Sequence, residues 1–82
     1  MITAAQIRAA RGALGWSAEL LSERSGVSLR TILRFEAAEG VPPSRSSTLL
    51  EVKNALEVGG IEFLSSSNDW GPGVRLRNPL RS

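Results

Sequence analysis

The chain has 82 residues, a length typical of one small domain, and its ten basic and eight acidic residues give a net charge of +2. It has no cysteine and no histidine, which excludes disulfides, the commonest zinc ligands and the usual nucleophile–base pairs of enzymes. No apolar run approaches the roughly 20 residues of a membrane span, and the amino-terminus does not resemble a signal peptide. We therefore expect a cytoplasmic protein without a cofactor, a metal site or enzymatic activity.

Nine of the ten basic residues are arginine. The planar guanidinium group suits phosphates and the edge of guanine, so this bias is compatible with nucleic-acid binding. A GC-rich genome also enriches arginine, and composition alone leaves both explanations open.

The amino-terminal half predicts two short helices. The first follows a capping box formed by Thr3 and Gln6 and ends at Gly15. The second begins after its cap residue Ser17 and ends at Gly26. Apolar residues at helical spacing give each helix a buried face.

A third helix is expected over about residues 28–38, with Ser28 as its cap and Ile32 and Phe35 on its buried face. The tight turn at residues 25–28 contains a glycine and sets this helix across the second one. The front of the third helix then protrudes. That is the layout of a helix-turn-helix, whose second helix fits the major groove of DNA.

A fourth helix is expected to begin near residues 44–47, where small hydroxyl residues suit a cap, and to end at Gly59-Gly60. Four short helices with brief links predict a mainly α fold. We assign residues 1–60 to one helical DNA-binding domain.

Residues 61–82 form a tail of different character. Residues 61–64 and 74–77 have the composition of short strands around a turn-rich segment, which predicts a β-hairpin or an extended tail. Because an isolated hairpin is marginal in water, it must pack on the helices or pair with a second chain. Trp70 is expected to anchor it to the helical core or to a partner chain, and residues 78–82 are expected to fray.

Residues 4–58 resemble the Cro- and phage-repressor-like helix-turn-helix family, also called the xenobiotic-response-element family. The resemblance rests on features at linked spacing: Ile7-Arg8 with Arg11, Gly15-Trp16-Ser17, Leu21-Ser22, Gly26-Val27-Ser28, Thr31-Ile32, Phe35-Glu36, and Pro43 with Thr48-Leu49 and Ala55-Leu56. It implies a compact lambda-repressor-like domain of four or five helices that binds double-stranded DNA, usually as a homodimer. The family's fifth helix is not evident, so residues 61–77 are the candidate dimer contact.

The resemblance also implies a structural ion pair between Arg11 and Glu36, which ties the first helix to the end of the third. Two positions depart from the family. Ala18 stands where many relatives have a glutamine that touches the DNA backbone or braces the third helix. Ser22 replaces the usual alanine at the contact between the two helices.

The residues expected to contact bases are Leu29, Arg30, Thr31 and Arg34. Arg30 or Arg34 could bind guanine O6 and N7 together, and nearby Leu33 could contact thymine methyl groups. The alternative is a solvated face in which the arginines pair with Glu23 or Glu36.

Backbone phosphates are expected at three helix starts, at Ser17, Ser28, and Ser44 with Arg45, although these residues could act as caps alone. Trp16 is expected to pack on Leu20 or the first helix. Three interpretations remain open for the basic cluster at Arg75, Arg77 and Arg81: a solvated strand face, a DNA-backbone contact, or salt bridges across a dimer.

These features predict a bacterial sequence-specific DNA-binding transcriptional regulator. The alternative is a protein-interaction module or an antitoxin-like protein with the same fold, whose tail binds a protein partner.

Overall fold

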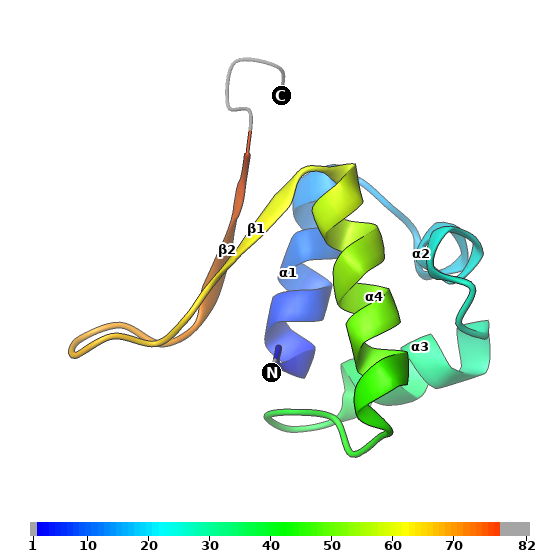
Figure 1. The fold of residues 1–82 in the computed structure, drawn as a ribbon, viewed down its shortest axis with the longest axis horizontal. Helices are drawn as coiled ribbons and strands as arrows, with labels where there is room; N and C mark the ends of the chain where they lie inside the picture. Colours follow the sequence, from blue (N-terminus) through cyan, green and yellow to red (C-terminus); the bar gives the residue numbers. More distant parts are fainter. Residues whose placement is uncertain (1, 78–82) are drawn as a thin grey trace.

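The computed structural model describes residues 2–77, which form four helices and a two-stranded sheet. The elements in chain order are α1 (Ala4–Leu14), α2 (Ala18–Ser25), α3 (Leu29–Ala37), α4 (Ser46–Gly59), β1 (Ile61–Leu64) and β2 (Gly73–Leu76). The helices α1 and α4 lie next to one another, the hairpin flanks them on one side, and α2 and α3 lie on the other (Figure 1). The predicted mainly α fold with a carboxy-terminal hairpin is confirmed. The expected fraying at 78–82 and the position of Arg81 lie outside the described residues.

Local signals in the sequence set the helix ends. Thr3 Oγ1 accepts a hydrogen bond from the Gln6 backbone at 3.1 Å, and Gln6 Oε1 accepts one from the Thr3 backbone at 2.8 Å. Gly15 and Gly26 end α1 and α2 in the left-handed conformation, with φ of 70° and 74°. A side chain would strain the backbone there, so glycine is the residue that suits these turns. The predicted caps and stops of both helices are confirmed.

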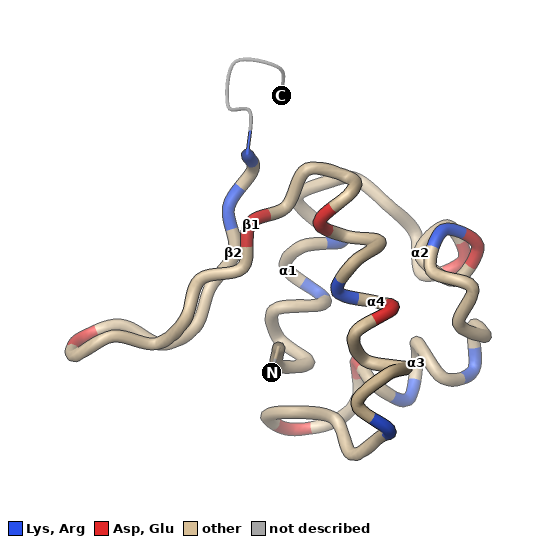
Figure 2. The backbone as a smooth tube through the Cα atoms, viewed as in Figure 1, with Lys and Arg blue, Asp and Glu red and all other residues tan. Residues whose placement is uncertain are grey.

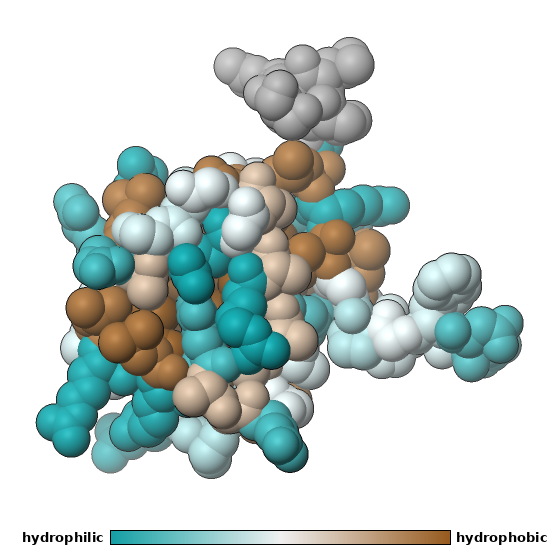
Figure 3. Space-filling view, turned by 180° about the vertical axis from the view of Figure 1, so that it is seen from behind, coloured by the Kyte–Doolittle hydropathy of each residue, from teal (hydrophilic) through white to brown (hydrophobic). Residues whose placement is uncertain are grey.

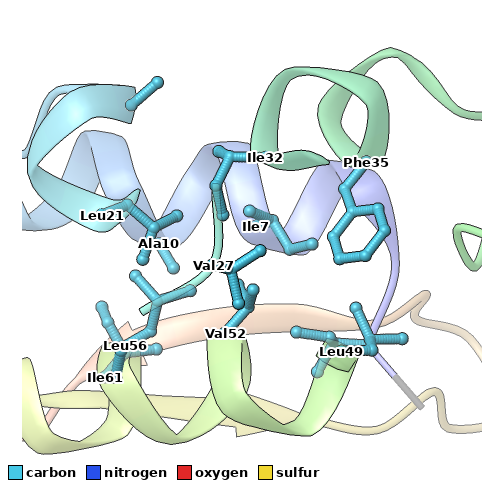
Figure 4. Close-up of a cluster of buried hydrophobic side chains, with 13 residues drawn as sticks. Ile7, Ala10, Leu21, Val27, Ile32, Phe35, Leu49, Val52, Leu56 and Ile61 are labelled. Carbon is cyan, nitrogen blue, oxygen red and sulfur yellow. The ribbon is translucent and has the colours of Figure 1, made fainter. Parts of the chain in front are cut away.

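One apolar core joins all four helices and the hairpin (Figure 4). Its largest fully buried side chains are Phe35, Ile7, Leu21, Ile32, Leu56, Ile61 and Val52. Ile32 and Phe35 come from α3 and hold one face of that helix against α1 and α4. These two apolar residues lie on one side of the helix, so the opposite face of α3 is left for solvent or a ligand.

The hairpin packs on α1 through its apolar face. Ile61 pairs with Leu76 and Phe63 with Val74, and these four side chains join the core cluster or pack against it. The amide of Gln6, only 5% exposed, donates to the carbonyl oxygens of Leu64 at 3.2 Å and Gly73 at 2.9 Å. One side chain therefore caps α1 and fixes both strands.

The two tryptophans have different surroundings, and only Trp70 departs from its expected packing on the helical core. Trp70 is 78% exposed, so its expected anchoring to the helical core is wrong. The ring of Trp16 lies so close to Gly59 that an added Cβ there would sit 2.7 Å from it. Arg24 stacks over the same ring, 5.3 Å from its centroid. Trp16 therefore secures the start of α2 to the end of α4, a contact that its spacing did not indicate.

Candidate nucleic-acid interface

The turn between α2 and α3 is held by side-chain hydrogen bonds. Val27 is buried in the core, and its carbonyl oxygen accepts from Ser22 Oγ at 2.6 Å. Its backbone nitrogen donates to Ser25 Oγ at 3.2 Å. The serine that replaces the family's alanine thus adds a bond to the turn. These contacts fix how α3 crosses α2 and so how its outer face is presented.

Ser28 caps α3, as predicted. Its Oγ accepts from the Thr31 backbone nitrogen at 3.2 Å and lies 3.0 Å from Thr31 Oγ1, to which it donates. Ser28 is exposed and Thr31 is half-buried. The cap leaves the first backbone N–H groups of α3 facing outward, where they favour an anion.

The outer face of α3 carries two exposed arginines and an exposed leucine. Arg30 and Arg34 form no salt bridge with any residue in the 2–77 segment, and Leu33 is 52% exposed. Leu29 is half-buried against the core, which leaves it at the margin of this face. The Arg34 guanidinium lies 5.9 Å from the Phe35 ring centroid. Pairing of these arginines with Glu23 or Glu36, the alternative considered from the sequence, is not found.

Glu36 instead forms an ion pair with an arginine of α1. Arg11 Nε and Nη2 donate to the two carboxylate oxygens of Glu36, each at 2.9 Å, and Arg11 Nη1 donates to the Trp16 carbonyl at 3.0 Å. The Glu36 side chain is only 9% exposed. The hydrogen bond with Glu36 raises the pKa of Arg11, against the opposing effect of burial. Arg8 donates to the Glu36 backbone carbonyl. The pair implied by the family resemblance is present and ties α1 to the end of α3.

Two further helix starts were expected to contact phosphate. Ser17 Oγ accepts from the Leu20 backbone nitrogen at 3.0 Å and caps α2. At α4 the cap position is Arg45, which makes no side-chain cap bond, and Ser44 Oγ donates to the Arg45 carbonyl at 2.8 Å. A hydroxyl cap for α4 was therefore a wrong expectation. The first N–H groups of α4 lack a side-chain acceptor and remain available to an anion.

The basic positions of α3 and of the start of α4 gather at the same end of the molecule (Figure 2). The arginines of the hairpin lie elsewhere, and they already have hydrogen-bond partners. Arg75 Nε donates to Glu62 Oε1 at 2.7 Å across the strands. Arg77 donates to the carbonyl oxygens of Glu57 and Ile61 at 2.9 and 3.4 Å. The hydrogen bond from Arg75 lowers the pKa of Glu62, and its positive charge adds to the effect.

A comparison with known protein families matches residues 7–52, more than half of the chain, to the family described as Helix-turn-helix. The chain belongs to this family. It is of the Cro- and phage-repressor, or xenobiotic-response-element, type. Membership in this helix-turn-helix family implies DNA binding, and its domains are typically non-enzymatic. A search of curated proteins found no match.

Residues 2–77 contain no helix with the length and hydropathy that a bilayer crossing requires. Within the same part of the chain, no three or more metal-ligating side chains of the Asp, Glu, His or Cys type come together.

Proposed function

We propose that this protein is a sequence-specific transcriptional regulator that binds double-stranded DNA as a homodimer, with α3 in the major groove. One observation supports this above all. The arginines at the α1–α3 contact and in the hairpin have carboxylate or carbonyl partners, whereas Arg30 and Arg34 on the outer face of α3 have no carboxylate partner within residues 2–77. Unpaired guanidinium groups on a protruding helix are available to phosphates and guanine edges.

Within this proposal, Arg30 and Arg34 contact bases. They are one helical turn apart and share a face, so both can enter one stretch of groove. A bidentate contact with guanine contributes roughly 1–3 kcal/mol of discrimination. Thr31 offers its methyl group to thymine, because its hydroxyl already pairs with Ser28. Leu29 contacts a base edge at the margin of the helix.

Phosphate contacts position the protein and supply most of the affinity. We assign them to the exposed helix starts at Ser17 and Ser28 and to Ser44 with Arg45. The uncapped start of α4 favours a phosphate more than the capped starts do, because its N–H groups lack a side-chain acceptor. Residues 1–60 then act as the DNA-binding unit, and residues 61–77 of the tail act in dimerisation.

The test is selection of bound sites from random duplex DNA, followed by titration of the enriched sites against salt. The proposal predicts an inverted repeat whose affinity falls steeply as salt rises. Weak binding without an enriched sequence would contradict base recognition. An absence of binding at low salt would instead favour a protein-interaction module.

A further inference from the structure

A cleft of about 360 Å³ opens between the end of α2 and one face of α4. Its volume falls within the range of small-ligand sites, roughly 300–1,000 Å³. The lining positions of α4 recur at the i, i+3, i+4 and i+7 spacing of a single helix face. They are Glu51, Asn54, Ala55 and Val58, and the facing wall includes Trp16 and Arg24. The cleft is separate from the outer face of α3.

Part of the cleft is apolar and already formed. The ring of Trp16 is held against Gly59, and Val58 beside it is 87% exposed. Single apolar residues on a surface are ordinary, and from behind the apolar areas of this molecule are separated by hydrophilic side chains (Figure 3). In the cleft, by contrast, an exposed valine and an indole ring line one hollow together with charged groups. An apolar ligand group placed there would be removed from water along with Val58.

Two opposite charges line the same cleft without meeting. Arg24 comes from α2 and Glu51 from α4, and neither forms a salt bridge with the other or with any residue in the 2–77 segment. Arg24 stacks over the Trp16 ring, 5.3 Å from its centroid. Stacking covers the flat face of the guanidinium group and leaves the N–H groups at its edge free to donate to a carboxylate. The cleft therefore presents an oriented cation, an anion and an apolar surface together.

We propose that this cleft binds a small zwitterion with an apolar side chain, namely an apolar α-amino acid. Its carboxylate pairs with Arg24, its ammonium group pairs with Glu51, and its side chain lies against Trp16 and Val58. An anion or a cation alone leaves one charge of the cleft unused, and a neutral apolar molecule leaves both. The inference goes beyond the proposed function and does not depend on DNA binding.

Nuclear magnetic resonance of the isotope-labelled full chain tests the site. The two tryptophans give indole N–H signals from separate places, since Trp16 lines the cleft and Trp70 is 78% exposed in the hairpin loop. The probes are L-leucine, L-methionine and L-phenylalanine, which share the zwitterionic group and differ in the apolar one. At least one probe should shift the Trp16 signal saturably and leave the Trp70 signal in place. If none of the three does so up to its solubility limit, the proposal is wrong.

Matched ligands separate the two charges. Phenylpropionate is L-phenylalanine without the ammonium group, and phenylethylamine is L-phenylalanine without the carboxylate. Each should bind at least about tenfold more weakly than L-phenylalanine, because one hydrogen bond between charged groups is lost. Phenylpropionate that binds as tightly as the amino acid would remove Glu51 from the site and contradict a zwitterion. Phenylethylamine that does so would remove Arg24.

Matched variants place the ligand in this cleft. Arg24→Met and Glu51→Gln each remove one charge at an exposed position and keep most of the side-chain shape. Each should weaken the binding of L-phenylalanine by about tenfold. The control is Glu23→Gln, which removes a carboxylate from an exposed position of α2 that does not line the cleft. Circular dichroism establishes that each variant is folded. Unchanged binding in both cleft variants, or an equal loss in the control, would contradict the proposed site.

Discussion

Two sides of α3 use charge in opposite ways. At its carboxy-terminal end, Glu36 is almost buried and both of its oxygens accept from Arg11. On its outer face, Arg30 and Arg34 are exposed and have no carboxylate partner among residues 2–77. The first arrangement holds α3 in place, and the second leaves it able to bind an anionic ligand. Removing a charge should therefore cost folding stability on the side packed against α1 and DNA affinity on the outer face.

The largest effect is expected at the largely buried pair of Arg11 and Glu36. Arg11→Met leaves the Glu36 carboxylate without its partner in a poorly solvated place, which should lower the free energy of unfolding by about 2–3 kcal/mol. Urea denaturation followed by circular dichroism measures this. The double variant Arg11→Met with Glu36→Leu should recover part of the loss, because no uncompensated charge remains. A single variant as stable as the wild type would show that the pair contributes nothing to the fold.

On the outer face of α3, substitutions should lower the affinity for DNA rather than the stability of the fold. Arg30→Ala and Arg34→Ala should each weaken binding to a selected site by about 10- to 100-fold, with unfolding free energies within about 0.5 kcal/mol of the wild type. Arg24→Ala provides the matched control, since Arg24 is exposed but stacks on Trp16 away from this face. Titration by fluorescence anisotropy gives the affinities. Unchanged affinity in both variants would remove α3 from the interface.

A smaller effect is expected at the start of α4. Arg45→Ala should weaken binding to all sequences alike and reduce the slope of log affinity against log salt by about 1. The measurement is a salt titration on one selected and one random duplex. A loss confined to the selected duplex would mean that Arg45 contacts a base, which would extend base recognition beyond α3.

The smallest effect is expected at the exposed ion pair of the hairpin, Arg75 with Glu62. It is the solvated counterpart of the largely buried Arg11–Glu36 pair. Arg75 lowers the pKa of Glu62, so the pair contributes stability above the ordinary pKa of Glu62 and loses that contribution as pH falls through the lowered value. Arg75→Ala should return the pKa of Glu62 toward its ordinary range, as followed by nuclear magnetic resonance of the side-chain carboxyl group. An unmoved pKa would indicate that the two side chains do not pair in solution.

Much of the fold could be predicted because it depends on neighbours in sequence. The Thr3–Gln6 capping box, the glycines that end α1 and α2, and the alternation in the hairpin are all local signals. The Arg11–Glu36 pair spans 25 residues, and only family resemblance pointed to it.

Contacts that depend on the final arrangement could not be predicted in this way. The amide of Gln6 reaches carbonyl groups 58 and 67 residues away, and Trp16 packs under Gly59. No periodicity encodes such distances. The same holds for the candidate site. Helical spacing predicted which residues share the outer face of α3, but it could not predict which arginines elsewhere form ion pairs or hydrogen bonds within the fold.

The most direct test of the central claim uses a selected site in which each guanine is replaced in turn by 7-deazaguanine. This change removes the N7 acceptor and leaves base pairing intact. Affinities are measured for the wild type, Arg30→Ala and Arg34→Ala. If an unpaired arginine of α3 contacts guanine, one replacement weakens the wild type and has no effect on the variant that lacks that arginine. Replacements that weaken all three proteins equally, or none, would contradict base recognition by these arginines.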